Sequence, residues 1–290
     1  MEPSSFTYES MGTHWEVSIW DKVEEYLFLK IQKDIVLMSE LFDQTYSRFI
    51  STSFVSRIST LTGTIEVPFD FIEMLKVYEQ FFKLSQKKVN PLIGCTLSDM
   101  GYDAEYSLKK KKIIHHTPNL LDTVIIKDQN HIEIKQPVVF DFGALGKGYF
   151  VDKIFTYLVK KGFKQILVNG SGDIHYQGDK SITVGLEHPL DTTKVIGTIQ
   201  FPKGAMCSSG TNRRAWGEYH HIIDPLTLSS PTEILAAWVI ADSAALADVL
   251  ATALFFVPPD DFFSHYTFEY LLMNRHMKVK RSPGFKAILF

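Results

Sequence analysis

Hydrophobic residues recur at helical spacing in two stretches of the N-terminal third of the chain. Residues 23–49 carry an apolar residue every three or four positions, which predicts a long amphipathic helix. Residues 69–84 repeat the pattern and predict a second helix. Before both, apolar and polar residues alternate in HWEVSIW, residues 14–20, which predicts the first strand. The apolar face of the longer helix consists of Leu27, Ile31, Ile35, Met38 and Phe42.

Short apolar runs in the middle of the chain predict strands. Residues 113–139 have the pattern of a hairpin or meander, and two more runs follow after residue 180. The predicted strands are DTVIIKD, HIEIK and VVFDF, and then SITVGLEHP and VIGTIQFP.

The most regular stretch runs from Val138 to Gly178. A β-rich run ends at Asp141, a glycine-rich turn follows, and the next helix is expected to end at Gly162 in the left-handed conformation. KQILVNG, residues 164–170, predicts a buried strand, so we expect a strand–helix–strand unit with its loops at the carboxyl edge of parallel strands. The helix is expected to bury Phe150, Val151, Ile154, Phe155, Leu158 and Val159.

An alanine-rich helix closes the series of predicted elements. It covers residues 242–257 and begins with Asp242 or Ser243 as its N-cap. Strands and helices in this order predict mixed α/β layers rather than a sandwich or a bundle. With 290 residues, no internal repeat and no low-complexity linker, the chain forms one large domain or two tightly joined lobes.

Composition narrows the classes of partner and compartment. The net charge of -3 points to neither nucleic acid nor an anionic membrane, and the one basic run, Lys109–Lys112, lacks interleaved aromatic residues and is expected to be a solvated loop. No apolar stretch is long enough for membrane insertion, and the N-terminus has no secretory-signal pattern. Cys95 and Cys207 are too few for a disulfide framework, so a reducing, cytoplasmic location is expected.

The glycine-rich turn DFGALGKG, residues 141–148, is a candidate anion site. Its three glycines let backbone amides approach an anion at a helix N-terminus, and Lys147 adds a positive charge. The spacing matches neither the dinucleotide pattern G-x-G-x-x-G nor the phosphate loop G-x-x-x-x-G-K-[ST]. The alternative is a tight turn that needs glycine only for its geometry.

Asp248 and Thr252 are four residues apart on the last predicted helix, so their oxygen atoms share one face. Their neighbours are apolar, and an uncompensated buried carboxylate is costly. A hard cation would compensate it, and a carboxylate, a hydroxyl, a backbone carbonyl and ligand phosphates are typical of Mg²⁺. The alternatives are that Asp248 pairs with an arginine or that this helix face is exposed.

Two polar loops are further candidates. NGSGD, residues 169–173, is either a ligand loop or a turn that needs Gly172 for a positive φ. AMCSSGTNRRAW, residues 205–216, offers hydroxyls and two arginines to a phosphate or ribose, or forms a polar hairpin. Nothing in its context activates Cys207 as a nucleophile.

The segment HHIIDPLTLSSP, residues 220–231, places two histidines in an irregular connection. Their spacing is not that of a metal site, and the chain has no H-E-x-x-H or C-x-x-C motif, so zinc is not expected. One histidine can act as a general base near neutral pH. The alternative is a structural histidine that caps backbone groups.

Taken together and in order, these segments resemble the ApbE family, the FAD:protein FMN transferases, over nearly the whole chain. The segments that carry the resemblance are MGTHWEVSIW, FDQTYSRFISTSFVSRI, DFGALGKGYFVD, VNGSGDIHYQG, SSGTNRR (family pattern T-S-G-x-x-x-R), HHIIDPLTLSSP and ADVLATALF. The resemblance implies a two-lobed fold of layered sheets and helices. It also implies a single domain over residues 1–290, with interleaved lobes and a ligand cleft between them.

The ligands and the residues that bind them are likewise implied by the resemblance. FAD is the expected substrate, and Mg²⁺ is expected on its diphosphate, bound by Asp248, Thr252 and the backbone carbonyl of Ala144. Further expected FAD contacts are Met11 and Phe49 near the rings, and Asn90, Asp141, Lys147, Ser209, Gly210 and Ile222.

The activity implied by the resemblance is a phosphoryl transfer. A threonine or serine hydroxyl of a partner flavoprotein attacks the FMN phosphorus, AMP leaves, and FMN remains in phosphoester linkage. His221 and Asp248 are the catalytic candidates, and His221 would take the hydroxyl proton, with Asp224 and Pro225 shaping its loop. The alternatives for the same cleft are a non-catalytic FAD-binding protein and a Mg²⁺-dependent FAD pyrophosphatase that gives FMN and AMP.

The chain departs from the family pattern at four positions, and in KKVNPLIGCTL one of them is Val89, where the pattern has an aromatic residue. Asn90 stands where the pattern has an acidic residue, and Ser171 and Leu228 each stand where it has a glycine. These departures concern the expected adenine and ribose contacts and leave the expected metal ligands unchanged.

Overall fold

The computed structural model describes residues 2–290; Met1, which the predicted domain includes, lies outside the described residues. Its largest element is an eight-stranded sheet in which neighbouring strands pair antiparallel. In spatial order its strands are β1 (Ser4–Ser10), β2 (Thr13–Ile19), β6 (Ile166–Gly170), β7 (Asp173–Gln177), β10 (Gly204–Gly210), β13 (Ile234–Ala241), β14 (Glu269–Asn274) and β15 (Val279–Arg281).

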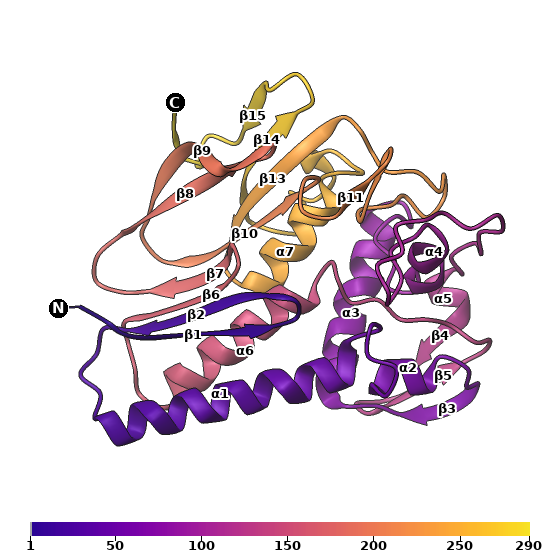
Figure 1. Ribbon diagram of the computed structural model, residues 1–290, viewed down its shortest axis with the longest axis horizontal. Helices are drawn as coiled ribbons and strands as arrows, with labels where there is room; N and C mark the ends of the chain where they lie inside the picture. Colours follow the sequence, from indigo (N-terminus) through magenta and orange to yellow (C-terminus); the bar gives the residue numbers. More distant parts are fainter. Residues whose placement is uncertain (1) are drawn as a thin grey trace.

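Three helices lie on one side of this sheet, as Figure 1 shows. α6 (Gly146–Lys160) and α7 (Ala244–Ala253) pack on the sheet and on each other, and α1 (Glu25–Tyr46) packs beside β1 and α6. The predicted apolar face of α1 is confirmed. Its buried members are Ile31, Ile35 and Phe42, and Leu27 and Met38 are partly buried.

A smaller three-stranded sheet packs against the opposite face of the large sheet. It consists of β8 (Ile182–His188), β9 (Asp191–Phe201) and β16 (Ile288–Leu289). Alternate side chains of β10 divide between the two cores, since Ala205 and Cys207 join the helical core and Met206 joins the core under the small sheet. The central strands β10, β13 and β14 therefore contribute to both cores, while β1 and β15 at the edges are more exposed.

A second lobe, on the right in Figure 1, is built mainly from residues 50–140. Its elements are α2 (Phe54–Ile58), α3 (Phe69–Leu84), α4 (Gly94–Asp99), α5 (Leu120–Thr123) and a sheet in the order β3 (Gly63–Glu66), β5 (His131–Ile134), β4 (Val124–Ile126). The remaining elements are the hairpin β11 (Ala215–Trp216) and β12 (Tyr219–His220), and a 3₁₀ turn, Pro259–Asp261. The mixed α/β class is confirmed.

The prediction of a strand over residues 138–142 is wrong. This apolar run is buried as an irregular segment, with the Phe140 and Phe142 rings each 5.1 Å from the ring of Phe71. The third strand of the second lobe's sheet, in addition to β4 and β5, is β3. The strand–helix–strand unit is therefore absent. β6 pairs antiparallel with β2 and β7, so the expected parallel edge is wrong as well.

Smaller corrections concern the ends and faces of elements. HWEVSIW is the second strand, because β1 precedes it and pairs with it, and Val159 is 40% exposed on the outer side of α6. Other predictions are confirmed: α3 covers Phe69–Leu84, and Gly162 has a φ of 95° after α6. The N-cap of α7 is Ser243, whose hydroxyl accepts the Leu246 N–H. No helix among residues 2–290 combines the length and the hydrophobicity needed to cross a bilayer.

Candidate functional site

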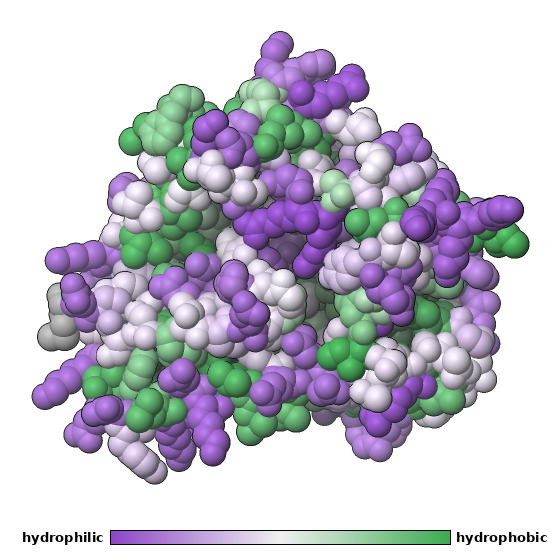
Figure 2. Space-filling model, in the orientation of Figure 1, coloured by the Kyte–Doolittle hydropathy of each residue, from purple (hydrophilic) through white to green (hydrophobic). Residues whose placement is uncertain are grey.

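A cleft of about 1110 Å³ lies where the large sheet meets the second lobe. Figure 2 shows it as a hollow bordered mostly by hydrophilic residues. Every residue expected to bind a ligand or to act in catalysis lines this cleft. They are Met11, Phe49, Asn90, Asp141, Ala144, Lys147, Ser209, Gly210, His221, Ile222, Asp248 and Thr252. The structure thus brings them together, while their individual roles stay predictions.

The carboxylate of Asp248 lies in the wall where α6 and α7 are in closest contact. It is only 4% exposed, and its Oδ2 accepts the Gly148 N–H at 2.9 Å. A Cβ on Gly148 would lie 2.2 Å from the Ala244 carbonyl oxygen, so glycine is what allows the two helices to approach. The sequence alternatives for Asp248 are wrong, because the residue is buried and no arginine among residues 2–290 pairs with it.

The glycine amides of residues 141–148, in the turn and at the start of α6, do not face an open anion site. Gly143 donates to Asp141 Oδ1 at 2.8 Å, Gly146 to the Phe142 carbonyl at 2.7 Å, and Gly148 to Asp248. All three N–H groups are therefore used within the chain. This supports the alternative that the turn needs glycine for its geometry, and leaves Lys147 as its cationic group.

Lys147 forms a buried ion pair that the sequence did not identify. Its Nζ lies 2.7 Å from Oδ2 of Asp173, a residue with no exposed surface, and Asp173 Oδ1 accepts the Ser208 N–H at 3.2 Å. Burial opposes the charge of Lys147, but the carboxylates of Asp173 and Asp248 raise its pKa above the ordinary value. Burial, and then the charge of Asp173, raise the pKa of Asp248 well above that of an ordinary aspartate.

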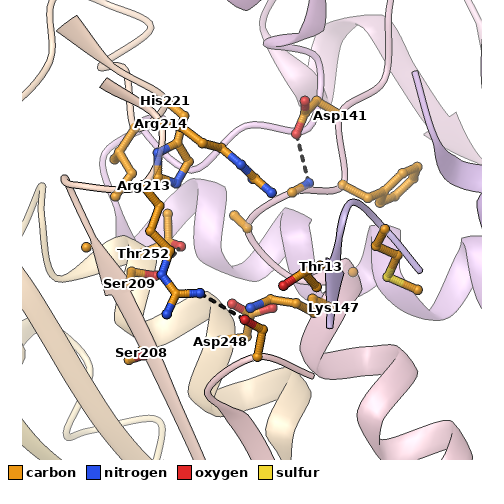
Figure 3. A pocket seen from close by; sticks show the side chains of 18 of the residues that line it. Thr13, Asp141, Lys147, Ser208, Ser209, Arg213, Arg214, His221, Asp248 and Thr252 are labelled. Carbon is orange, nitrogen blue, oxygen red and sulfur yellow. Dashed lines mark hydrogen bonds between the residues drawn. The ribbon is translucent and has the colours of Figure 1, made fainter. Parts of the chain in front are cut away.

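This wall has the donors that a hard divalent cation requires. Two carboxylates share one ammonium, so their negative charge is incompletely balanced within the wall. The hydroxyls of Thr252 and Ser209 lie beside them, 3.3 Å apart, and Figure 3 shows both near Asp248 and Lys147. Carboxylate, hydroxyl and carbonyl oxygens are suitable ligands for Mg²⁺. Ala144, whose backbone carbonyl is the third expected ligand, lines the same cleft.

The two histidines of residues 220–231 have different environments. His220 is buried, and both ring nitrogens bond to backbone: Nε2 with the Pro231 carbonyl at 2.9 Å, and Nδ1 with the Ile222 N–H at 3.3 Å. His220 is thus the structural histidine of the sequence alternative. His221 lines the cleft, and its buried Nδ1 has no hydrogen-bond partner among residues 2–290.

Charge and burial act together on His221. Burial, followed by the positive charge of Arg214, lowers the pKa of His221 to about 3. The side chain of Arg214 extends into the cavity in Figure 3, with its guanidinium carbon 5.8 Å from the ring centre of Tyr102. His221 is therefore a neutral imidazole at neutral pH.

Asp141 is held by an arginine that lies 93 positions away in the sequence. Arg48 Nε donates to Asp141 Oδ2 at 2.5 Å, and its other nitrogens donate to Ser98 Oγ and to the Tyr102 carbonyl. The Arg48 guanidinium also lies 4.2 Å from the ring centre of Phe49. This network fixes the side of the cleft that belongs to the second lobe.

The side chain of Asn90 lines the cleft but makes its hydrogen bonds to backbone groups. Its Oδ1 accepts the Leu92 N–H at 3.0 Å, and its Nδ2 donates to the Pro118 carbonyl at 2.9 Å. Met11, with a φ of 53°, is fixed in the β1–β2 turn by a bond from its N–H to Asp43 Oδ2 at 3.1 Å. The structure therefore positions both residues through backbone contacts.

Sequence reasoning did not select three further residues of the site: Arg48 and Tyr78, which line the cleft, and Asp173, which pairs with Lys147 in its wall. Asp173 lies in the polar loop of residues 169–173, so its loop was detectable but its ion pair was not. Arg213 and Arg214 are the two arginines that the sequence offered to a phosphate or ribose, and both line the cleft. Arg48 carried no signal, because its partner is distant in the sequence.

Neither cysteine is suited to act as a nucleophile or as a metal ligand for this site. Cys207 is fully buried in β10 with its pKa raised by burial, which agrees with the expectation that it is not a nucleophile. Cys95, Asp99 and His115 approach within metal-ligand distances, but Lys111 and His115 already occupy the Asp99 oxygens at 2.9 and 2.6 Å. Burial raises the pKa of Cys95, so this cluster fits a metal poorly.

Comparisons with known proteins agree on one family. The model of the ApbE family matches residues 11–269. A FAD:protein FMN transferase of Klebsiella pneumoniae is 30% identical over 129 residues, which are 42% of this chain and 40% of that protein. A FAD:protein FMN transferase of Chlamydia trachomatis is 25% identical over 276 residues, covering 87% of this chain and 84% of that protein.

Solved structures show the same fold. The crystal structure of the ApbE protein of Thermotoga maritima superposes with a TM-score of 0.86 at 22% identity and covers 98% of both chains. The flavin transferase ApbE of Vibrio cholerae superposes with a TM-score of 0.81 at 18% identity, again over 98% of both chains.

Proposed function

Because the chain belongs to the ApbE family, we propose that it transfers FMN from FAD to a threonine or serine hydroxyl of an acceptor flavoprotein and releases AMP. The observation that carries the proposal is the cleft wall in which Lys147, Asp173, Asp248 and Thr252 meet. Buried carboxylates with a single ammonium and adjacent hydroxyls suit a cation and a diphosphate, and a purely apolar ligand would not need them.

Mg²⁺ is part of the proposal. Asp248, Thr252 and the carbonyl of Ala144 would hold it, and Asp173 would keep Lys147 beside it. When bound, the ion neutralises charge on the diphosphate and on the transferring phosphoryl group. Lys147 adds a fixed positive charge at the same place, because the ion pair with Asp173 restricts its side chain.

His221 is the proposed proton acceptor. The acceptor hydroxyl oxygen forms a bond to the FMN phosphorus, the bond from that phosphorus to the AMP oxygen breaks, and the hydroxyl proton passes to His221. Burial, and after it the charges of Arg214 and Lys147, lower the pKa of this histidine. An anionic nucleotide in the cleft offsets those charges and raises the pKa of His221 toward the range in which a base is effective.

The test is an incubation of the protein with FAD, MgCl₂ and an acceptor flavoprotein domain. Intact-mass spectrometry of the acceptor and chromatography of the nucleotides are the readouts. Acceptor mass increased by one FMN, with one AMP per transfer, supports the proposal. AMP and free FMN with an unmodified acceptor would instead identify a FAD pyrophosphatase, and unchanged FAD would identify a flavin-binding protein. An acceptor whose hydroxyl residue is replaced by alanine, and a sample with EDTA, are the controls.

A further inference from the structure

The mouth of the cleft carries an arginine at a position that the family pattern leaves unspecified. In SSGTNRR the pattern arginine is Arg214, and Arg213 precedes it. The side chain of Arg213 lines the cleft, and Figure 3 shows it extending toward the wall that holds Asp248, Ser208 and Thr252. A second guanidinium, besides that of Arg214, thus lines the cavity.

Arg213 is held by two side chains from separate parts of the fold. Its Nη1 donates to Ser171 Oγ at 2.9 Å, in the turn between β6 and β7. Its Nη2 lies 2.6 Å from Oε2 of Glu187, near the end of β8, and its Nε lies 3.4 Å from Oε1 of the same carboxylate. The arginine side chain is 48% exposed, so this ion pair is screened and can exchange.

Ser171 adopts a backbone conformation that favours glycine. Its φ is 57° and that of Gly172 is 99°, as in a two-residue hairpin turn with both central residues left-handed. The family pattern has glycine where this chain has Ser171. A glycine would remove the strain together with the hydroxyl that holds Arg213, and strained conformations are kept mainly where function requires them.

A neighbouring amide points to an anionic occupant. Asn212 lines the same part of the cleft, and its buried Nδ2 has no acceptor among residues 2–290. Arg213 therefore offers its guanidinium to the cleft, and the unpaired Asn212 Nδ2 lies buried in the wall beside it. A phosphate has the acceptor oxygens and the charge to satisfy them, and an arginine fork suits phosphate geometry.

From this geometry we infer that Arg213 binds a phosphate of the nucleotide, and that Glu187 holds the guanidinium when no nucleotide is bound. The inference rests on the proposed function, because it takes FAD as the occupant of the cleft. Ser171 is a positioning residue that keeps Arg213 over the mouth. Glu187 competes with the nucleotide for the same guanidinium.

The test measures dissociation constants for FAD, ADP and riboflavin in the presence of Mg²⁺ with the full-length chain. Arg213→Gln should raise the Kd for FAD and for ADP about tenfold, since one charge-assisted contact is lost, and leave the Kd for riboflavin unchanged. The Kd for FAD of Arg213→Lys should lie between those of the wild-type protein and Arg213→Gln, because lysine keeps the positive charge but lacks the two-pronged guanidinium. An unchanged FAD Kd, or an equal increase for riboflavin, would overturn the inference.

Glu187→Gln distinguishes two roles of the Arg213–Glu187 ion pair: competition with the nucleotide for Arg213, and structural support of the loop. If Glu187 competes with the nucleotide, this isosteric change should lower the Kd for FAD about threefold. If the ion pair only braces the loop, the Kd should rise, and that outcome contradicts the inference. Ser171→Gly should raise the melting temperature by removing strain and still raise the Kd for FAD about threefold; a lower Kd would contradict its positioning role.

The inference and the proposed function fail in different ways. If Arg213→Gln weakens FAD binding and the wild-type protein transfers nothing to an acceptor, the inference stands and the proposed transfer is wrong. If the wild-type protein transfers FMN and Arg213→Gln binds FAD normally, the transfer stands and the inference is wrong.

Discussion

The walls that carry Asp248 and His221 show the same physical effect with opposite signs. Burial raises the pKa of Asp248 well above its ordinary value and lowers that of His221 to about 3, so burial disfavours the charged form in both. The second contribution is a like charge in each case, Asp173 for the acid and Arg214 for the base. One wall therefore suits a cation and the other an anion.

This difference shows that each wall favours a bound charge of opposite sign: a cation beside Asp248 and Asp173, and an anion beside Arg214 and His221. A cation beside Asp248 would lower its pKa, and an anion beside Arg214 would raise that of His221. Paired groups whose pKa values are displaced in opposite directions are typical of acid–base sites. The following variants test each wall, beginning with the largest expected effect.

Asp248→Asn removes the charge of the acidic wall and keeps an oxygen that can accept the Gly148 N–H at this position. We expect turnover to fall about 100-fold or more, because several kcal/mol of charge stabilisation depend on the bound cation. Added Mg²⁺ should raise the melting temperature of the wild-type protein and not that of the variant. Full turnover in the variant would refute the metal assignment.

In the absence of Mg²⁺, Asp248→Asn is expected to stabilise the fold, although it lowers turnover. Because the folded pKa of Asp248 lies above the ordinary value, its ionised form destabilises the fold, and this cost grows as pH rises above the ordinary aspartate pKa. Without Mg²⁺ at pH 7, Asp248→Asn should therefore melt at a higher temperature than the wild-type protein. A lower melting temperature would mean that the carboxylate is compensated within the chain.

His221→Gln tests the basic wall. We expect kcat to fall about 100-fold, as for loss of a general base, with the Kd for FAD changed less than about twofold. The matched control is His220→Gln, whose ring bonds to the Pro231 carbonyl and the Ile222 N–H predict a loss of stability. Equal effects of His221→Gln on kcat and Kd would identify it as a second structural histidine.

The pH dependence of stability gives an independent check on His221. Its folded pKa of about 3 lies below the ordinary 6.5, so the unfolded chain binds one more proton between these values. Its contribution is fully present above pH 6.5 and is lost on acidification, by up to about 1.4 kcal/mol per pH unit. Urea unfolding at pH 5 and pH 7 should show a smaller acid loss in His221→Gln than in the wild-type protein.

Gly148→Ala tests the helix contact that places Asp248. Its Cβ would lie 2.2 Å from the Ala244 carbonyl oxygen and 2.7 Å from Asp248 Cβ, so α6 and α7 must separate. A loss of about 1–3 kcal/mol in unfolding free energy is expected. Gly146→Ala is the control, because the nearest atoms to its Cβ would be Phe142 Cβ at 3.4 Å and Phe42 Cε1 at 4.0 Å, both at ordinary contact distances. Equal stability of the two variants would argue against this contact.

Leu228→Gly has the smallest expected effect. Leu228 has a φ of 55° in the loop after His221, where glycine avoids strain, although glycine also favours the unfolded chain. A gain of up to about 1 kcal/mol in unfolding free energy is expected from chemical denaturation. Leu226→Gly, at an exposed position outside the left-handed set, should only destabilise. A destabilised Leu228→Gly would show that its side-chain packing outweighs the strain.

Local patterns in the sequence determined the helices and the composition of the site. The limits of α3 and the buried face of α1 follow from periodicity, which depends only on neighbouring residues. The family resemblance of the ordered motifs also identified a set of residues, from Met11 to Thr252, that all line the cleft. Those features needed no knowledge of where distant segments meet.

Only the tertiary structure decided how these elements and charges are paired. Hydrophobicity showed that residues 138–142 are buried, but burial against Phe71 and pairing in a sheet produce the same pattern. Separate segments of the chain are joined by three contacts: Arg48 with Asp141, Lys147 with Asp173, and Gly148 with Asp248. The tertiary structure also decides that His220 bonds to the backbone, whereas its neighbour His221 lines the cleft. Partner choice depends on the path of the whole chain, so it cannot be inferred from any one stretch of sequence.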